Sequence, residues 1–511
     1  MAASSILFDH LSHWASVQPD AAFMVEAETG RTVTYAQTLA AVHRLRRDLG
    51  DAPACVPLAL PGGVENGLVW LSALTGGHTL LPFAPQATAH EAARLSSLFA
   101  PDVVVVERLE DASRLGICGA RVMARETWQG LLAAEAPAAG QAPGSVGGRI
   151  CLLTSGSTGD PKGVLLEERQ LAWTAEQIRS SHRLTPMDRG LAVLPFFHIN
   201  APVVSLLASL LAGSTVVIAP HFRRSHFWEW VERHSVTWAS VVPTIVAMLL
   251  ETEAPACLPG TLRFLRTASA PLPALQQRRF EQKFGVPIIE TYGLTEAASQ
   301  VCANPLPPER HLPGSVGRPV GFSLRICRPR TPAWRGPCPL EDVPTGGLGE
   351  ICIAGPGLIS AYVGEAGGAA FEGSWFRTGD LGYQDAKGYV YLTGRLRDVI
   401  IRGGENVAPR EIEEVLLAHP AVSEAAVVGR PDPFYGEQVV AYVVASTPWT
   451  AELEDELRTL CAERLIPYKA PSDFVAIAAL PRTHTGKLDR QRLRREQAGG
   501  DHPRTARVSV A

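Results

Sequence analysis

The chain has 511 residues, of which 46% are hydrophobic and 19% are charged, and its formal net charge at pH 7 is −4. A chain of this length exceeds what one hydrophobic core usually organises, so two or more domains are expected. The small negative net charge gives no indication of nucleic-acid binding. The nine cysteines are scattered without a C-x-x-C pair, which argues against zinc ribbons and redox dithiols.

The N-terminal stretch MAASSILFDH lacks both a basic start and a long apolar run, so it does not have the form of a secretory signal. We therefore expect a cytoplasmic protein with reduced thiols. The uncharged stretch at 199–220 is about as long as a membrane span. Because Pro202 and the Gly213-Ser214 break interrupt it before a β-branched run, it predicts a buried helix followed by a strand, and no membrane contact.

The N-terminal part of the chain alternates helical patterns with short apolar strands. A helical pattern covers 35–49, and strand patterns cover 56–60, 79–83 and 103–106. Such alternation predicts helix-covered, mostly parallel sheets. A stretch rich in Ala, Pro and Gly at 135–148 predicts a surface linker before a buried strand at 150–153.

The ten residues that follow this strand read TSGSTGDPKG. Glycines let a backbone turn its N–H groups inward, hydroxyls add donors, and Lys162 supplies a compact positive charge. The spacing is not that of the common P-loop, which ends in Gly-Lys-Ser/Thr. We predict a polyphosphate-binding loop, with a plain strand connection as the alternative. Its predicted binding residues are Thr154, Ser155, Gly156, Ser157, Thr158, Gly159 and Lys162.

Beyond the loop, the pattern predicts a return strand at 164–166 and a helix at 168–182. Further strands are predicted at 191–194, 236–241, 264–265 and 287–290, and each ends at a turn that carries polar groups. In open α/β sheets ligands bind at the carboxyl ends of the strands. These turns are therefore expected to converge on one cleft.

The character of the chain changes near residue 395. A hairpin is predicted through 385–388. After it come a helix at 409–417, strands at 425–428 and 439–444, a helix at 452–465 and a strand at 474–477. The predicted division is a large α/β domain at 1–396, a small mobile α+β domain at 397–496 and a disordered tail at 497–511.

Four motifs, in this order, resemble those of the adenylate-forming (AMP-binding) superfamily, which includes acyl-CoA synthetases, carrier-protein adenylation domains and beetle luciferases. They are the 154–163 loop, ETYGLTE at 290–296, WFRTGD at 375–380 followed by Gly394-Arg395, and PRTHTGKL at 481–488. The stretches PGSVGRP at 313–319 and GGENV at 403–407 look closest to stand-alone acyl-CoA synthetases. The resemblance implies an N-terminal adenylation domain and a mobile C-terminal lid.

The resemblance also implies ATP and Mg²⁺ as cofactors. It places the ring of Tyr292 against adenine, the hydroxyl of Thr295 at the α-phosphate and the carboxylate of Glu296 on Mg²⁺. An aromatic face suits a planar base, and a carboxylate suits a hard cation. Further nucleotide-binding residues implied by the same matches are Ser269, Ala270, Pro271, Glu290, Thr291 and Gly293.

Residues of the third and fourth motifs complete the implied nucleotide site. Asp380 matches the carboxylate that accepts both ribose hydroxyls, and Arg395 matches an arginine that touches the ribose or phosphate. Lys487 matches the catalytic lysine that bridges the acid and the α-phosphate, although an exposed lysine is otherwise plain surface. Arg397 stands at the implied hinge, where the family usually has Asp or Lys.

The acyl pocket is expected after the strand at 191–194. His198 matches a family residue that gates the pocket, with a core histidine as the alternative. Ligases for malonate or oxalate often carry a second histidine where this chain has Asn200, which argues against a small dicarboxylate. An apolar or aromatic acid is expected instead from the residues Ile199, Ala201, Pro202 and Trp238. The predicted pocket residues are His198, Ile199, Asn200, Ala201, Trp238, Thr267, Ala268 and Gly293. A separate histidine group at 221, 226 and 234 lacks metal spacing and is expected on a helix surface.

The expected function is ATP-dependent activation of a carboxylic acid through an acyl-AMP with pyrophosphate release, followed by acyl transfer to coenzyme A. Two other acceptors stay open: an amine, with His198 as the base, and the thiol of a carrier protein. An adenylate-binding protein without catalysis is the alternative from another class. Such a protein would be expected to lose Lys487 or Glu296, and both are present.

Overall fold

The computed structural model describes residues 5–125, 147–154, 162–253, 255, 260–330, 340–363, 370–482 and 488–498. The chain divides into two compact units. The first comprises Met1–Leu324 and Ile353–Phe376, and the second comprises Arg325–Cys352 and Arg377–Ala511. The domain boundary at residue 397 stays a prediction, as does the linker at 135–148, most of which lies outside the described residues.

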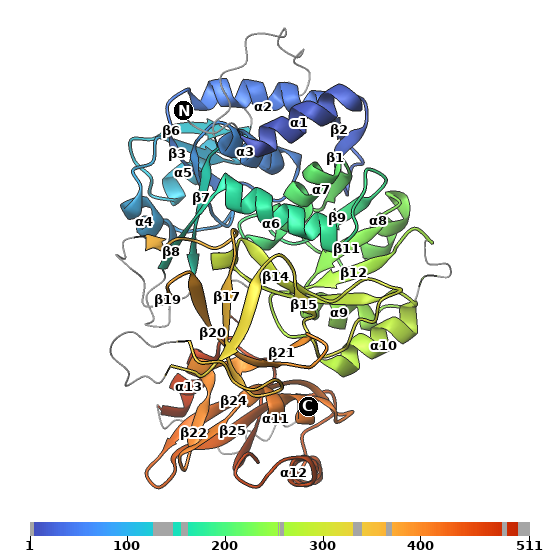
Figure 1. Cartoon of the computed structure of the whole chain (residues 1–511), viewed down its shortest axis with the longest axis vertical. Coiled ribbons are helices and arrows are strands. Elements are labelled where there is room, and N and C mark those ends of the chain that lie inside the picture. Colours follow the sequence, from blue (N-terminus) through green and yellow to red (C-terminus); the bar gives the residue numbers. More distant parts are fainter. Residues whose placement is uncertain are drawn as a thin grey trace, which may run out of the picture. The chain divides into compact units, whose positions relative to one another are not determined.

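The larger sheet of the first unit is mostly parallel (Figure 1). Its described strands run in the order β15-β14-β13-β12-β11-β9-β10-β1-β2, and the strands from β13 to β1 are parallel to their neighbours. They are β1 (Ala22–Glu26), β2 (Thr32–Thr34), β9 (Arg189–Ala192), β10 (Thr215–Ile218), β11 (Trp238–Val241), β12 (Phe264–Thr267), β13 (Ile288–Leu294), β14 (Ser299–Ala303) and β15 (Arg318–Pro319). The prediction of helix-covered parallel strands is confirmed, although β9 begins two residues before the predicted strand at 191.

The smaller sheet of the first unit carries the start and the end of the predicted phosphate loop. Its order is β18-β8-β7-β4-β3-β5-β6. The strands are β3 (Cys55–Ala59), β4 (Thr79–Pro82), β5 (Val103–Val106), β6 (Arg121–Ala124), β7 (Arg149–Thr154), β8 (Lys162–Glu167) and β18 (Tyr362–Val363). β7 is antiparallel to β8, which confirms the predicted return strand. Residues 155–161, which join them, lie outside the described residues.

Helices cover both faces of the larger sheet. The described α-helices of the first unit are α1 (Ile6–Val17), α2 (Tyr35–Leu49), α3 (Val64–Thr75), α4 (Ala89–Leu98), α5 (Leu109–Arg114), α6 (Glu168–Ser181), α7 (Ala208–Ala212), α8 (Phe227–Arg233), α9 (Pro243–Leu250) and α10 (Ala274–Phe284). α3 is buried along nearly its whole length and contacts β1 of one sheet and β4 and β7 of the other. A helix that is apolar on all sides belongs in such a core. α8, α9 and α10 cover the opposite face of the larger sheet.

Local sequence explains why α2 matches its prediction at both ends. The hydroxyl of Thr34 accepts the backbone N–H of Gln37 at 3.2 Å, and the side chain of Gln37 accepts the N–H of Thr34 at 3.0 Å. This capping box satisfies two donors that the first helical turn leaves open. α2 lies beside α1 (Figure 1).

The uncharged stretch at 199–220 forms a buried helix and then a strand, as predicted. A π-helical segment, η3 (Ala201–Leu207), continues into α7, which ends at Gly213 with a φ of 70°. β10 follows and is completely buried. Among the described residues, no helix has both the length and the apolar character needed to span a bilayer.

The second unit contains the predicted α+β elements. Its sheet order is β23-β22-β25-β24, with β26 beside β25. Bounds are β22 (Ile400–Arg402), β23 (Glu405–Val407), α11 (Pro409–Leu417), β24 (Val422–Asp432), β25 (Gly436–Ala445), α12 (Ala451–Arg464), β26 (Asp473–Ala476) and α13 (Arg490–Ala498). The pattern did not predict β22, β23 or α13. α13 also extends two residues into the predicted tail, and 499–511 lie outside the described residues.

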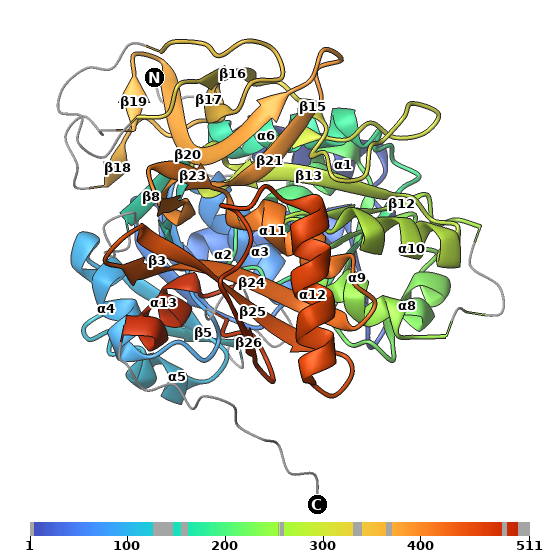
Figure 2. The same ribbon diagram turned by 90° about the horizontal axis from the view of Figure 1, so that it is seen from below.

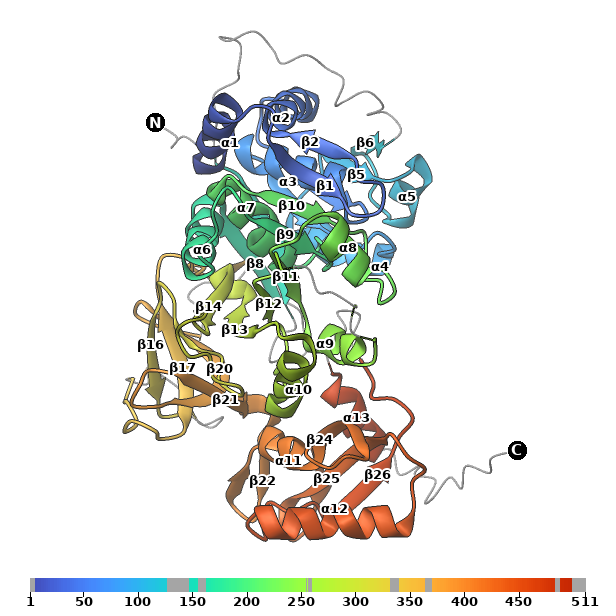
Figure 3. The ribbon, with the colours of Figure 1, turned by 90° about the vertical axis from the view of Figure 1, so that its right-hand side faces the viewer.

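Alternation along β25 separates the two cores of this sheet. Val439, Ala441 and Val443 pack with α11 and α12, whereas Val440 and Tyr442 pack with Leu493 of α13. Successive side chains of a strand point to opposite faces, so α12 and α13 lie on opposite sides of the sheet (Figure 3). Figure 2 shows α12 crossing the strands of this sheet.

A second small sheet carries the third motif. It comprises β16 (Ser323–Cys327), β17 (Gly349–Ala354), β20 (Trp375–Gln384) and β19 (Phe371–Glu372), with β21 (Val390–Arg395) beside β20. The predicted hairpin joins β20 and β21, and the carboxylate of Asp385 accepts the N–H groups of Lys387 and Tyr389, both at 2.9 Å. In the same sheet, Arg377 of β20 and Glu350 of β17 form an ion pair at 2.6 Å, with side-chain exposures of 3% and 4%.

We expect Arg377→Met to lower the free energy of unfolding by about 3–5 kcal/mol, because it leaves the carboxylate of Glu350 buried without its cation. The matched control is Arg482→Met. Its ion pair with Glu424 has the same length, 2.6 Å, but side-chain exposures of 37% and 41%, so it should cost less than about 1 kcal/mol. Denaturant unfolding of both variants measures the difference, and equal losses would contradict the expectation.

Candidate functional site

Three predicted site segments follow strands that are close neighbours in the larger sheet. The segment 198–201 follows β9, the turn 267–271 ends β12, and the motif 290–296 spans the end of β13. Because these strands are parallel, their carboxyl ends lie at one edge of the sheet. Within the first unit, the turns after β9, β12 and β13 therefore meet at one sheet edge, whereas the single cleft between them stays a prediction.

Hydrogen bonds tie these segments together. The hydroxyl of Thr291 donates to the carbonyl of Thr267 at 3.0 Å, and the carboxylate of Glu290 accepts the N–H of Leu272 at 3.1 Å. The amide of Asn200 donates to the hydroxyl of Ser269 at 3.3 Å. Ser269 has a φ of 74°, a conformation that is uncommon outside glycine and often found at functional turns. Ala270 and Pro271 continue the same turn.

The turn at Gly293 depends on the absence of a side chain. β13 turns back into the antiparallel β14, with an irregular register between Tyr292 and Gly293. A Cβ atom at Gly293 would lie 1.4 Å from the carbonyl oxygen of Ser299, which no packing could relieve. The close approach holds Tyr292, which is buried, at the end of the strand. Thr295 and Glu296 then form the first residues of the single turn η4 (Thr295–Ala297).

Tyr362 joins the predicted metal carboxylate to the end of the predicted phosphate loop. Its hydroxyl donates to Oε1 of Glu296 at 2.9 Å, and Nζ of Lys162 lies 4.8 Å from the centre of its ring. The contact is possible because β18 pairs with β8, placing Tyr362 opposite Val164. No motif surrounds Tyr362, so the sequence did not predict a role for it.

Two predicted groups lie outside the described residues. They are Ser155, Gly156, Ser157, Thr158 and Gly159 of the loop, and Lys487 of the fourth motif. Thr154 is the last residue of β7. The roles of these residues stay predictions.

In the second unit, Asp380 and Arg395 face each other in the β20–β21 ladder, with Nε of Arg395 at 3.0 Å from the Asp380 carboxylate. The Asp380 side chain is 9% exposed and that of Arg395 is 47% exposed. The structure therefore pairs these two predicted ribose contacts. Arg397, the predicted hinge residue, is exposed in the turn η5 (Leu396–Asp398).

The predicted acyl segment combines apolar and polar residues. Ile199, Ala201 and Ala268 are buried, and His198 is half-buried beside the ring of Phe197, with ring centres 4.5 Å apart. Trp238 is completely buried: it stacks on Phe264 and leaves no room for a side chain at Gly190. It lies two residues further from the carboxyl edge than Ser240.

A buried arginine stands behind this segment. Nη1 of Arg266 donates to Oδ1 of Asn200 at 2.8 Å and to the hydroxyl of Ser240 at 3.3 Å. Burial lowers the pKa of Arg266 to about 9. The motifs did not predict a role for Arg266, although a charged residue inside an apolar strand, beside the predicted pocket wall, is a signal of such a role.

The expectation for the histidine group is wrong at His234. This side chain is buried rather than on a helix surface, and its Nε2 lies 2.9 Å from the carbonyl oxygen of Ala27. Strand pairing of the distant N-terminal segment creates that contact. No cluster of potential metal ligands was found among the described residues.

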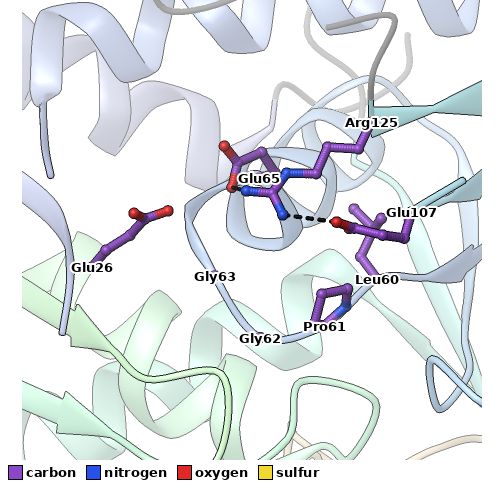
Figure 4. A pocket seen from close by; sticks show the side chains of 8 residues that line it. All are labelled: Glu26, Leu60, Pro61, Gly62, Gly63, Glu65, Glu107 and Arg125. Carbon is purple, nitrogen blue, oxygen red and sulfur yellow. Dashed lines mark hydrogen bonds and ion pairs between the residues drawn. The ribbon is translucent and has the colours of Figure 1, made fainter. Parts of the chain in front are cut away.

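A small cavity elsewhere in the first unit contains none of the predicted site residues (Figure 4). It is lined by Leu60–Gly63 and by charged side chains that pair with one another. Arg125 binds Glu107 at 2.9 Å and Glu65 at 3.4 Å, and Arg31 binds Glu26 at 2.5 Å. Each charged side chain that lines the cavity therefore has an oppositely charged partner.

Comparison with known proteins agrees with this arrangement. Residues 11–363 match the AMP-binding enzyme family, and residues 411–487 match the AMP-binding enzyme C-terminal domain. A sulfoacetate–CoA ligase of Cupriavidus necator is 45% identical, and an oxalate–CoA ligase of Arabidopsis thaliana is 38% identical. Each match covers 67% of this chain and 66% of the relative, so the aligned part spans just under two thirds of these ligases.

A solved structure extends the likeness to the whole fold. The crystal structure of ATP-bound MatB from Rhodopseudomonas palustris superposes with a TM-score of 0.86 at 27% identity, covering 97% of this chain and 99% of MatB. The family match includes the sheet edge where the predicted site segments meet. The chain belongs to the AMP-binding enzyme family.

Proposed function

We propose that this protein activates a carboxylic acid with ATP and transfers the acyl group to coenzyme A. The observation that carries the proposal is the meeting of 198–201, 267–271 and 290–296 at one sheet edge in a chain of this family. The sulfoacetate–CoA and oxalate–CoA ligases are named for joining short acids to coenzyme A, which supports the thiol acceptor.

The proposed reaction has two steps. First, a carboxylate oxygen of the acid attacks the α-phosphorus of ATP. The bond between the α-phosphorus and the oxygen that bridges it to the β-phosphorus breaks, pyrophosphate departs with the electron pair, and an acyl-AMP remains. Then the thiolate of coenzyme A attacks the acyl carbon, and AMP leaves with the electron pair of the broken bond. Negative charge builds up on the α-phosphate oxygens in the first step, so donors and cations placed there would accelerate it.

Glu296 fits the role of a Mg²⁺ ligand. Its carboxylate stands in the η4 turn directly after the Tyr292-Gly293 approach, and the hydroxyl of Tyr362 fixes one of its oxygens. Carboxylates are the side chains that Mg²⁺ prefers, and when bound the ion would neutralise phosphate charge. In the same proposal Thr295 donates to the α-phosphate, Tyr292 stacks on adenine, and Asp380 and Arg395 hold the ribose.

We propose further that Lys487 supplies a positive charge for the first step and is withdrawn for the second. One ammonium group cannot serve both steps from one position, so a rotation of 397–496 about Arg397 would exchange the two arrangements. Location in the cytoplasm belongs to the same proposal.

Pyrophosphate release, measured with ATP, Mg²⁺ and a panel of carboxylic acids, tests the first step. Repeating the assay with coenzyme A, with amines and with a phosphopantetheinyl carrier protein, and weighing the products by mass spectrometry, tests the second. A thioester of coenzyme A is the expected product. An amide or an acylated carrier protein would replace the proposed acceptor, and binding of ATP without pyrophosphate release would indicate an adenylate-binding protein.

Lys487→Ala is expected to slow acyl-adenylate formation by about 10²–10³-fold, because one lost charge-stabilising donor typically costs that much. The control Lys387→Ala removes a lysine from the exposed turn of the β20–β21 hairpin and should leave the rate unchanged. Pyrophosphate–ATP exchange measures both. A Lys487→Ala enzyme with the wild-type exchange rate would rule out the proposed role.

Glu296→Gln and Tyr362→Phe should both raise the free Mg²⁺ concentration needed for half-maximal exchange. The first change removes a charged ligand, so its effect should be the larger. The second removes only the hydrogen bond that orients the ligand, and an effect of roughly tenfold is expected. Tyr435→Phe, at a tyrosine that is 52% exposed, serves as the control. An unchanged Mg²⁺ dependence in Glu296→Gln would place the ion elsewhere.

A further inference from the structure

Arg266 carries a positive charge inside the first unit without a compensating carboxylate. It is 1% exposed. Its Nη1 hydrogen-bonds to Asn200 and Ser240, which are both neutral. Within the described part of the chain, its Nε has no hydrogen-bond partner, and no acidic group offsets the effect of burial on its pKa. A cation in such a position is normally paired.

Two other enclosed arginines, Arg377 and Arg490, are each paired with a carboxylate. Arg377 has the Glu350 carboxylate at 2.6 Å, and Arg490 has the Glu413 carboxylate at 2.5 Å. Although burial lowers the pKa of Arg490, the carboxylate of Glu413 raises it overall. Arg266 has the burial but no such carboxylate. Its neighbour His182 is a neutral imidazole and not a counter-charge, since burial and the two arginines at 266 and 263 hold the pKa of His182 well below its usual range.

The position of Arg266 connects it to the predicted acyl segment. Arg266 is the penultimate residue of β12 and pairs in register with Ser240 of β11. Asn200, the residue before η3, accepts from Arg266 through its oxygen and donates to Ser269 through its amide nitrogen. Ser269 is exposed. A continuous polar path therefore leads from the surface turn at 267–271 to the buried guanidinium.

We propose that Arg266, with Asn200 and Ser240, binds a second anionic group of the acid that the enzyme activates. The substrate is then a short acid that carries a carboxylate or sulfonate in addition to the reacting carboxylate. Arg266 lies one residue from the carboxyl edge, and a strand rises only about 3.3 Å per residue, so a spacer of one or two carbons fits. This inference rests on the proposed function, and it departs from the expectation of an apolar or aromatic acid.

An anion at this position would supply the counter-charge that the neutral partners of Arg266 do not provide. A carboxylate or sulfonate offers several acceptor oxygens to the planar donor fork of arginine, and such charge-assisted hydrogen bonds are the strong ones. An acid of the same shape whose second group is uncharged would leave the guanidinium buried without a counter-charge. Such an acid keeps the reacting carboxylate, and it is called the neutral acid below because its second group is neutral. The enzyme should therefore discriminate strongly between the acid with a charged second group and the acid without one. A site whose buried polar groups bind one substrate group rejects an analogue that lacks this group.

The test compares acids that differ only in the second charge. Malonate is paired with malonamate, and sulfoacetate with methylsulfonylacetate, so the carboxylate and sulfonate forms are examined separately. We expect kcat/KM for pyrophosphate release by the wild-type enzyme to be about 100-fold higher for the dianion of at least one pair. A wild-type enzyme that prefers the neutral member of both pairs, or shows no preference, overturns the inference.

Arg266→Met keeps an unbranched side chain and removes its charge. It should lower kcat/KM for the preferred dianion by about 100-fold, mainly through KM, and leave the neutral partner unchanged or improved. The control Arg263→Met removes a neighbouring arginine that Asp188 already pairs at 2.8 Å, and it should not change the ratio between the acids. An equal loss for both acids in Arg266→Met would assign Arg266 a structural role and overturn the inference.

Failure of the inference and failure of the proposed function are distinguishable. Pyrophosphate release with neutral acids alone would keep the function and overturn the inference. No release with any acid would overturn both. If Arg266→Met does not fold, as judged by circular dichroism, the inference is tested by the wild-type enzyme alone, through its preference within the two pairs of acids.

Discussion

The candidate site depends on the parallel pairing of β9, β11, β12 and β13. These strands are buried on both faces, between α3, α6 and η3 on one side and α8, α9 and α10 on the other. Burial on both faces specifies their register strongly, because a slip of one residue would exchange the two faces of every strand. With the register set, the turns after β9, β12 and β13 have to meet at one edge, whatever their distance in the sequence.

Contacts between backbone segments also determine where individual site residues lie at this sheet edge. The return of β14 along β13 requires the approach of Gly293 to Ser299, and this approach aims the η4 turn that carries Glu296. Tyr362 reaches Glu296 because a short strand far along the chain adds to the edge of the smaller sheet. Each of these positions is set by the pairing of distant backbone segments, which a local sequence pattern does not encode.

The buried arginines Arg377 and Arg266 differ in whether a carboxylate compensates their charge. Where Arg377 meets Glu350, the fold supplies both partners and the charges are compensated. At Arg266 the fold supplies only neutral partners. Buried charges usually occur in pairs because desolvation is costly, so the missing anion at this site points to a ligand. This asymmetry is the basis of the inferred acid class.

The sequence by itself determined the elements with strong local signals and the order of the motifs. The helices at 35–49 and 409–417 match their predictions at both ends, because a capping box starts the first and Pro409 starts the second. Only the tertiary structure revealed Tyr362, the enclosed Arg266 and the burial of His234, since each depends on contacts between distant segments. β22, β23 and α13 also escaped prediction: the two strands have three residues each, and RQRLRREQA has one large apolar residue, Leu493, and hence no amphipathic period.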